Sequence, residues 1–345
     1  MQISERIFFC VADKIKDQNY GVGHLNRCRM LLNSPYNKAK SSNLVIISEN
    51  TKIELLNQKE CLLNPNIEWA KQLKNAMIEG NCDFIFDCSC KYLIKSPNSL
   101  NTFLDTYKKA GIKFHIIDSY GQESIFSAIE NKSLVTNLFI PYMIPKKFKP
   151  NYEYHGGKEF LLIDQRFNVT KKLPVKKAKI LITTGGSDPE EISCKVIQIL
   201  SKFKDILNIR LVVGPNFSEE LVSRINKLVC KSKHSIKIIF SPGSLIDEIK
   251  KCSIGICTSG LTKYEFGFSG TPVIVIPFDD TQKKLNEGLE EIFLMSDLHK
   301  DNNNFLEILE SLYYNQTVNL EYSKKLKTFF SQNGVKNFFN IINNA

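Results

Sequence analysis

The sequence lacks the features that mark metal-binding, membrane-spanning and nucleic-acid-binding proteins. Its ten cysteines include no CxxC pair, which argues against zinc ribbons and dithiol redox sites. No run approaches the roughly 18 to 20 apolar residues that a membrane-spanning helix needs. Zinc-finger, ribonucleoprotein and basic heptad motifs are missing, as are a DxD motif and a histidine cluster. We therefore expect reduced thiols, no metal or cofactor, and no nucleic-acid partner.

Charge and composition describe a globular chain. The first residues, MQISERIFFCVAD, contain an acidic residue and too short an apolar core for a signal peptide, so we expect a cytoplasmic protein. The net charge of +10 would suit an anionic ligand or membrane face, but the basic residues are dispersed and are interpreted mostly as solvated surface. With 345 residues, 43% of them hydrophobic, the chain is long enough for two domains with separate cores.

Short apolar runs alternate with amphipathic stretches along the chain, which is typical of βα units around parallel sheets. We expect two α/β halves with a cleft between them. The stretch KKLPVKKAK at 171–179 is the expected linker, which gives domains at 1–174 and 175–345. The expected strands are 6–11, 44–48, 84–87, 113–117, 179–183, 209–213, 236–240, 254–257 and 273–276. The expected helices are 25–32, 69–78, 99–110, 191–202, 218–229, 245–250 and 262–267.

The stretch YGVGHLNRC at 20–28 places a histidine behind two glycines, just before an expected helix. Gly21 and Gly23 let a backbone approach a phosphate at the positive end of that helix. An imidazole there is suited to general base catalysis at neutral pH, but His24 could equally cap the helix. Of the other histidines, His115 in an apolar run is interpreted as a hydrogen-bonded core or strand-end residue, and His234 in polar surroundings as a surface residue.

A second glycine turn follows the strand at 179–183. Thr184 begins the sequence TGGSDP, in which Pro189 fits the first turn of a helix and Asp188 or Ser187 fits its N-cap. The paired glycines also leave a bare backbone for a pyrophosphate. The sequence supports the structural and the functional interpretation about equally.

Residues 252–291 are the most informative stretch. They read as a strand that ends at TSG, a helix from about Leu261, a second strand PVIVIP, and a further helix. Glu265 falls near the start of the first helix, where carboxylates are common for electrostatic reasons but can also accept hydrogen bonds from a ribose. Gly260 lets a nucleotide lie against the turn, and Gln282 and Asn286 lie on the later helix. The spacing places these residues near the carboxyl edge of the sheet, where open α/β sheets bind ligands.

Three stretches match one family in order and spacing: GVGHLNRC (21–28), ILITTGGSDP (180–189), and TSGLTKYEFGFSGTP with QKKLN (258–272 and 282–286). Over residues 5–295 the chain resembles the UDP-2,4-diacetamido-2,4,6-trideoxy-β-L-altropyranose hydrolases of pseudaminic acid synthesis. The resemblance implies the GT-B fold, with two Rossmann-like, doubly wound domains facing a central cleft. In that fold the C-terminal helix often returns to the first domain.

The resemblance also implies roles for single residues. His24 would be the base that activates water, and Glu265 would hold the ribose. The residues implied to bind substrate are Asp13, Gly21, Gly23, Arg27, Gly185, Gly186, Ser187, Ser259, Gly260, Thr262, Glu265, Gln282 and Asn286.

Departures from the family pattern cluster on the sugar side. The family has an arginine before the early aspartate, where this chain has Val11 before Ala12-Asp13. The family's Asp-x-Tyr after the third strand reads Asp87-Cys88-Ser89. The arginine expected before the second domain falls within LLIDQRF, where Asp164 replaces it unless Arg166 takes that role.

The implied reaction is attack of water at the anomeric carbon of a UDP-sugar, with departure of UDP and inversion. Two alternatives stay open. In a GT-B glycosyltransferase, an acceptor hydroxyl would replace water, and a lipid-linked acceptor would bring the protein to a membrane, which is otherwise not expected. A non-catalytic nucleotide-sugar binding protein would share the same residues without turnover.

Overall fold

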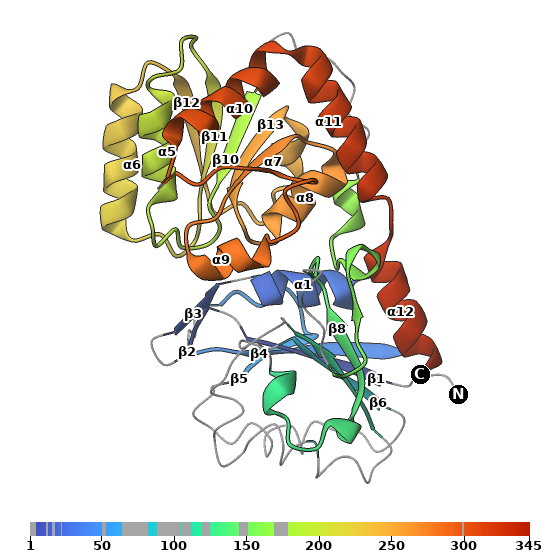
Figure 1. Ribbon diagram of the computed structural model, residues 1–345. Helices are drawn as coiled ribbons and strands as arrows, with labels where there is room; N and C mark the ends of the chain where they lie inside the picture. Colours follow the sequence, from blue (N-terminus) through green and yellow to red (C-terminus); the bar gives the residue numbers. More distant parts are fainter. Residues whose placement is uncertain are drawn as a thin grey trace. The chain divides into compact units, whose positions relative to one another are not determined.

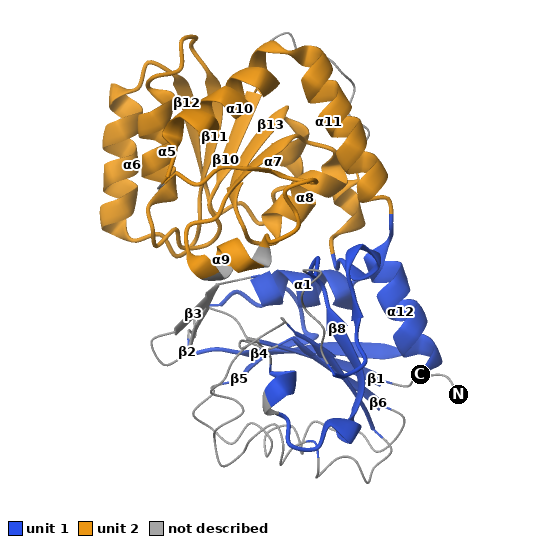
Figure 2. Cartoon of the chain, in the orientation of Figure 1, with its two compact units in different colours: residues 1–144, 149–162, 332–345 blue, residues 145–148, 163–331 orange. Residues whose placement is uncertain are grey.

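The structure is a computed structural model of the chain. It describes residues 5–11, 13–15, 18–21, 23–49, 53–63, 82–87, 104, 112–118, 125–144, 151–168, 179–298 and 300–345, with the backbone alone at 11, 13–15, 18–21, 128, 281 and 285. The chain divides into two compact units (Figure 2). Unit 1 comprises Met1–Ile144, Lys149–Leu162 and Gln332–Ala345, and unit 2 comprises Pro145–Phe148 and Ile163–Ser331. The division after Leu162 precedes the boundary expected at residue 175.

Unit 1 is built on a seven-stranded sheet in which all neighbouring strands pair in parallel. Phe8, Phe9 and Phe84 in its central strands are fully buried, as expected for parallel strands covered on both faces. A hairpin of β2 (Asp13–Ile15) and β3 (Gln18–Gly21) lies between the first strand and helix α1 (Gly23–Leu32). In sheet order the strands are β5 (Glu60–Leu63), β4 (Ser41–Ile47), β1 (Glu5–Val11), β6 (Cys82–Asp87), β7 (Lys113–Ile117), β8 (Val135–Ile140) and β9 (His155–Gly156).

The C-terminal helix α12 (Gly334–Asn344; Figure 1) belongs to unit 1 (Figure 2). Its residues Val335, Phe338, Phe339 and Ile342 follow helical spacing and are buried with Phe8 and the apolar face of α1 in one core. Gly334 begins the helix against the backbone of Leu161, where a Cβ atom would come within 2.2 Å of the carbonyl oxygen. Only glycine fits there, so this contact fixes where α12 docks.

Unit 2 contains a six-stranded parallel sheet and most of the α-helices among the described residues. In sheet order its strands are β12 (Ser235–Phe240), β11 (Asn208–Val213), β10 (Lys179–Thr183), β13 (Ile254–Thr258), β14 (Val273–Ile276) and β15 (Leu294–Met295). Its helices are α5 (Ile192–Leu200), α6 (Glu219–Lys231), α7 (Ile246–Lys250), α8 (Thr262–Ser269), α9 (Asp280–Leu285), α10 (Asn302–Tyr314) and α11 (Gln316–Phe329). Short 3₁₀ helices are η2 (Phe126–Ala128), η3 (Lys132–Leu134) and η4 (Lys158–Phe160) in unit 1, and η5 (Gln165–Phe167) in unit 2.

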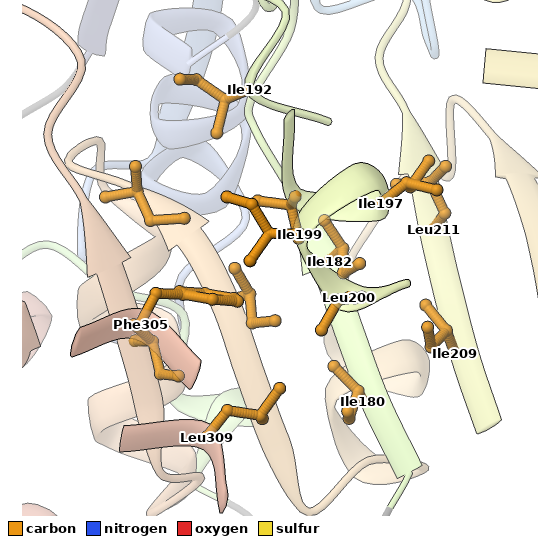
Figure 3. Packing of buried hydrophobic residues seen from close by; sticks show 14 of the residues in the cluster. Ile180, Ile182, Ile192, Ile197, Ile199, Leu200, Ile209, Leu211, Phe305 and Leu309 are labelled. Atoms are coloured by element: carbon orange, nitrogen blue, oxygen red, sulfur yellow. The ribbon is translucent and has the colours of Figure 1, made fainter. Parts of the chain in front are cut away.

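The core of unit 2 is aliphatic. Figure 3 shows Ile180 and Ile182 of β10 packed with side chains of α5 and with Phe305 and Leu309 of α10. These side chains are all buried, and each contributes about 1.5 to 3 kcal/mol by leaving water. This packing holds the strands rigid up to their carboxyl ends, where the loops begin.

Both sheets have the doubly wound order in which the first strand lies between the second and the fourth. In unit 1 these strands are β1, β4 and β6, and in unit 2 they are β10, β11 and β13. Ligands of such sheets bind where the strand order reverses, outside the carboxyl ends of the strands. The loops after β1, β6, β10 and β13 are therefore the places to look for a site.

The predicted α/β class with two Rossmann-like, doubly wound sheets is confirmed. The predicted strands 113–117, 179–183 and 273–276 coincide with β7, β10 and β14. The short strand β5 and the partly polar β8 were not predicted. The helix expected at 69–78, most of that at 99–110, and nearly all of the linker at 171–179 lie outside the described residues.

Candidate functional site

The first candidate site lies where the strand order of unit 1 reverses. His24 is the second residue of α1, and its Nδ1 atom lies 2.7 Å from Oδ1 of Asp87, the last residue of β6. The side chain of His24 is 14% exposed, whereas that of Asp87 is fully buried. The imidazole is therefore partly accessible to solvent, and its orientation is fixed by the buried carboxylate. Among the described residues, the ring of His24 contacts the side chains of Asp87 and Arg27.

The carboxylate determines which nitrogen of His24 carries the proton. A contact of 2.7 Å between Nδ1 and an ionised carboxylate oxygen needs a hydrogen between the two atoms. Nη2 of Arg27 also lies 3.2 Å from Nδ1, but it donates to Oδ1 of Asp87 at the shorter distance of 2.6 Å. The proton is therefore assigned to Nδ1, which donates it to Asp87. Nε2 keeps its lone pair and has no hydrogen-bond partner among the described residues. This is the arrangement of a histidine oriented to act as a base.

Arg27, one turn further along α1, holds the other side of the carboxylate. Its Nε donates to Oδ2 of Asp87 at 2.6 Å, and its Nη2 donates to Oδ1 at 2.6 Å. Burial lowers the pKa of Arg27, but the attraction of Asp87 and of Tyr142 outweighs burial and raises it above its ordinary value. Arg27 was expected to bind substrate. In the structure its guanidinium is 95% or more buried and holds Asp87.

Asp87 stays ionised because of these two neighbours. Burial raises the pKa of its carboxyl, but the charges and hydrogen bonds of Arg27 and His24 lower it to about 2. The thiol of Cys28 also lies 3.8 Å from Oδ2. A carboxylate that is charged at every physiological pH keeps His24 in one tautomer.

The glycines before α1 are described only in part. Gly23 is exposed, and a Cβ atom there would meet nothing within 4 Å. Gly21 ends β3 and pairs with Asp13 of β2. Only the backbone of Asp13 and Gly21 is described, so a contact of these two residues with substrate stays a prediction.

The second candidate site lies where the strand order of unit 2 reverses. The turn after β10 contains Gly185 at a φ of +94°, a value that favours glycine. A Cβ atom on Gly214 would lie 2.4 Å from the carbonyl oxygens of both Gly185 and Gly186. The turn is therefore packed against bare backbone on its inner side. No atom lies within 4 Å of a Cβ atom built on Gly185 or Gly186, which leaves room for a ligand.

Two backbone N–H groups at the start of α5 already have a hydrogen-bond acceptor within the chain. The carboxylate of Asp188 accepts from the backbone N–H groups of Ile192 and Ser193, at 2.8 and 2.9 Å. Burial raises the pKa of Asp188, and these hydrogen bonds oppose that effect. Those two helical N–H groups are therefore not available to a phosphate. A ligand at this turn is left with Gly185, Gly186 and the half-buried Ser187.

Glu265 lies in the first turn of α8 with an unsatisfied acceptor. Its Oε2 atom is buried and has no hydrogen-bond partner among the described residues. Burial and the nearby charge of Asp164 raise the pKa of Glu265 to about 7, against the effect of a hydrogen bond from Thr262. A buried carboxylate with a free oxygen costs stability. It is suited to a ligand that brings hydroxyl donors.

A buried polar network links α8, α9 and the end of β13. Asn286 donates to Oγ of Ser259 at 2.6 Å and accepts from Nζ of Lys263 at 2.6 Å. The backbone N–H of Ser259 donates to Oε1 of Gln282 at 3.3 Å. Gly260, next to Ser259, is exposed. The structure thus brings together Ser259, Gln282 and Asn286 as expected from their spacing.

Two residues of these sites were not assigned a role from sequence. Asp87 was noted only as part of an altered motif, although it ends a predicted strand at the edge where ligands bind. Lys263 lies between two residues of the predicted nucleotide site but was not assigned a role, because a lysine in a helix usually faces solvent. Within the described part of the chain, no group of three or more His, Cys, Asp or Glu could hold a metal ion. No helix among the same residues is long and apolar enough to cross a membrane.

Comparison with solved structures defines the class. Acinetobacter baumannii MurG superposes with a TM-score of 0.67 at 12% identity, over 99% of this chain and 100% of that chain. Anabaena HepE, solved in complex with UDP-glucose, gives 0.63 at 11% identity, over 99% and 98%. The Neisseria meningitidis UDP-GlcNAc 2-epimerase bound to UDP-GlcNAc gives 0.55 at 12%, over 98% of each chain. The chain has the GT-B fold.

Comparison with curated proteins gives partial matches. An uncharacterized protein of Methanocaldococcus jannaschii is 32% identical over 184 residues, which cover 46% of this chain and 37% of that protein. A Helicobacter pylori protein is 26% identical over 132 residues, covering 38% and 23%. It is named pseudaminic acid cytidylyltransferase and UDP-2,4-diacetamido-2,4,6-trideoxy-β-L-altropyranose hydrolase. The matches thus span well under half the length of these relatives, and no protein-family model matches the chain.

Proposed function

We propose that the chain is a UDP-sugar hydrolase. It acts in the cytoplasm on a nucleotide-activated amino-deoxyhexose, as in the synthesis of pseudaminic acid or a related surface glycan. The observation that carries the proposal is the contact between His24 and Asp87, which leaves Nε2 of His24 free to act as a base. The partial similarity to the Helicobacter pylori protein supports hydrolysis, and the neighbours solved with UDP-sugars support the substrate class.

In the proposed reaction, unit 1 provides the base and unit 2 binds the nucleoside. Water gives a proton to Nε2 of His24 while its oxygen bonds to the anomeric carbon. The bond from that carbon to the β-phosphate oxygen breaks, UDP leaves with the electron pair, and the configuration inverts. General base catalysis contributes about 10²- to 10⁴-fold. Backbone groups of the Gly185–Gly186 turn would stabilise the departing diphosphate, and Glu265 would accept from the ribose hydroxyls.

A GT-B glycosyltransferase is the second candidate. The structural similarity to MurG supports it. The chemistry also allows it, because a free Nε2 can deprotonate an acceptor hydroxyl as well as water. A lipid-linked acceptor would then bring the protein to a membrane surface. The two candidates differ in one requirement, the acceptor.

The test measures UDP released from a panel of UDP-amino sugars, with and without candidate acceptors. Release without acceptor, with an inverted anomer seen by NMR, is expected. Release only with acceptor supports the transferase, and tight UDP-sugar binding without release supports a binding protein. His24→Ala is expected to lose about 10²- to 10⁴-fold in rate. Asn26→Ala, at an exposed position of the same helix, is the matched control and should keep full activity.

A further inference from the structure

Lys263 is a buried cation without a buried anion. Its side chain, in the first turn of α8, is 2% exposed. Its ammonium contacts Oδ1 of Asn286 at 2.6 Å and lies 5.0 Å from the ring centroid of Tyr264. No carboxylate among the described residues forms an ion pair with it. Buried lysines are rare unless paired, and a cation at a helix N-terminus is disfavoured by the helix dipole.

The ammonium fixes the orientation of the Asn286 amide. An ammonium group has only donors, so the amide oxygen of Asn286 must face it. The amide nitrogen then donates to Oγ of Ser259 at 2.6 Å and to the backbone oxygen of Gln282 at 2.7 Å. A flipped amide would place its two hydrogens against the ammonium. Lys263 therefore holds the whole amide in one direction.

The same directionality extends to Ser259, whereas the side chain of Gln282 is oriented by two backbone N–H groups. Since Oγ of Ser259 accepts from Asn286, its hydroxyl hydrogen is left to donate elsewhere. The oxygen Oε1 of Gln282 accepts from the backbone N–H groups of Ser259 and Phe278, at 3.3 and 3.5 Å. Its amide hydrogens have no acceptor among the described residues. Both side chains thus offer donors at the carboxyl end of β13.

We propose that Lys263 is a positioning residue that orients Ser259, beside the donor amide of Gln282, as a hydrogen-bond donor toward the diphosphate of the nucleotide. The inference rests on the proposed function and extends it to a residue outside the predicted site. A diphosphate carries only hydrogen-bond acceptors and negative charge, so it is suited to bind donors that lie near a buried cation. A sugar hydroxyl or a base carbonyl would use one donor but would gain little from the charge.

The test compares uridine, UDP and a UDP-sugar by calorimetry on the full chain. Lys263→Met removes the ammonium, and Asn286→Asp keeps a partner for Lys263 but turns Ser259 into a donor to the new carboxylate. Both variants are expected to weaken UDP binding about 10- to 100-fold, with uridine binding unchanged. Lys284→Met, at an exposed position of α9, controls for the loss of a positive charge.

Each other outcome overturns the inference. Equal losses for uridine and UDP would show that Lys263 only maintains the fold of the site, and a lower melting temperature would accompany them. A loss seen with the UDP-sugar but not with UDP would place the donors on the sugar. Wild-type affinity for UDP in Asn286→Asp, or no UDP binding by the wild type, would also refute it. The proposed function fails separately, if UDP binds with the expected pattern but no UDP-sugar is turned over.

Discussion

Arg27 and His24 meet at the same oxygen of Asp87: Nη2 of Arg27 lies 2.6 Å and Nδ1 of His24 lies 2.7 Å from Oδ1. An arginine has only donors and an ionised carboxylate has only acceptors, so both groups donate to Asp87. The two donors lie close together, with Nη2 of Arg27 3.2 Å from Nδ1 of His24. The charge of Arg27 helps to keep Asp87 ionised, and the ionised carboxylate keeps the proton of His24 on Nδ1. The chemistry of the partly exposed imidazole therefore depends on two buried residues.

The first prediction concerns Asp87→Asn. The neutral amide keeps the shape of the carboxylate but can present its hydrogens to His24, which then carries its proton on Nε2. We expect the rate of UDP release to fall about 10²- to 10⁴-fold with KM little changed. Steady-state kinetics measure the effect, and thermal melting shows whether the variant is folded.

The comparison for this prediction is His24→Ala combined with Asp87→Asn. If Asp87 acts through His24, the double variant should be no slower than His24→Ala alone. Multiplied losses would mean that Asp87 acts independently of the imidazole.

The second prediction concerns the buried pair of Arg27 and Asp87. Removing one partner leaves a buried charge, so Arg27→Met should lower the free energy of unfolding at pH 7 by about 3 to 5 kcal/mol. Adding Asp87→Leu should recover much of this loss in stability but no activity. Urea denaturation measures Arg27→Met, Asp87→Leu and the double variant. If the loss of stability in the double variant equals the sum of the two single losses, the pair is not coupled.

This loss should depend on pH. The pKa of Asp87 is about 2 in the folded chain, below its ordinary value, so its stabilising effect is present above about pH 4 and is lost as pH falls through 2. The difference between wild type and Arg27→Met should therefore shrink in acid. A difference that stays constant down to pH 2 would contradict this assignment of charge.

The fold could be predicted from the sequence because buried strands show directly as apolar runs. β10 and β14 consist of residues that are almost all buried, so hydrophobicity alone located both ends. β8 begins with Val135, Thr136 and Asn137, of which none is fully buried, and this mixed pattern hid it. Short or half-polar strands depend on neighbours in the sheet, which a local pattern does not contain.

Only the candidate site residues that lie within short sequence motifs could be predicted. His24 and Glu265 lie in short stretches with glycines and could be named as candidates from the sequence, but the partner of His24 is 63 residues away on another strand. His234 was predicted at the surface because its neighbours in sequence are polar, and this was wrong. Its side chain is buried, since its ring nitrogens pair with the backbone of Leu200 and Leu207 at 2.7 and 3.2 Å. His115 lies in the core, one of the two places predicted for it, but its Nε2 atom has no hydrogen-bond partner among the described residues.

The third prediction concerns Glu265, which costs stability in the unliganded protein. Its pKa is about 7 in the folded chain, above the ordinary 4.5, so the unfolded chain releases this proton first as pH rises. Stability therefore falls between about pH 4.5 and 7. Glu265→Gln should be more stable than wild type at pH 8, by on the order of 2 to 3 kcal/mol, and nearly equal to it at pH 4.

The same variant should bind UDP and uridine weakly, because an amide is a poorer acceptor for two hydroxyls than a carboxylate. Glu290→Gln, at an exposed position, removes the same charge without either effect. Calorimetry and urea denaturation at pH 4 and 8 make the comparison. Greater stability together with undiminished UDP binding would mean that Glu265 does not contact the ribose.

The fourth prediction concerns His115 in β7, which is fully buried in unit 1. Its Nδ1 atom pairs with Asn137 at 3.0 Å, and its Nε2 atom has no hydrogen-bond partner among the described residues. Burial, with the charges of Arg6, Lys113 and His155, lowers its pKa to about 3. The unfolded chain therefore binds a proton at this residue below about pH 6.5, and the folded chain does not until about pH 3.

Stability should accordingly fall as pH drops from 6.5 toward 3, and His115→Gln should remove that part of the pH dependence. At pH 8, where the imidazole is neutral in both states, the variant should be less stable by about 1 to 3 kcal/mol because packing is lost. The difference should narrow or reverse by pH 4. Urea midpoints at pH 8, 6, 5 and 4 test this, since parallel decline of wild type and variant would mean that His115 takes up its proton equally in both states.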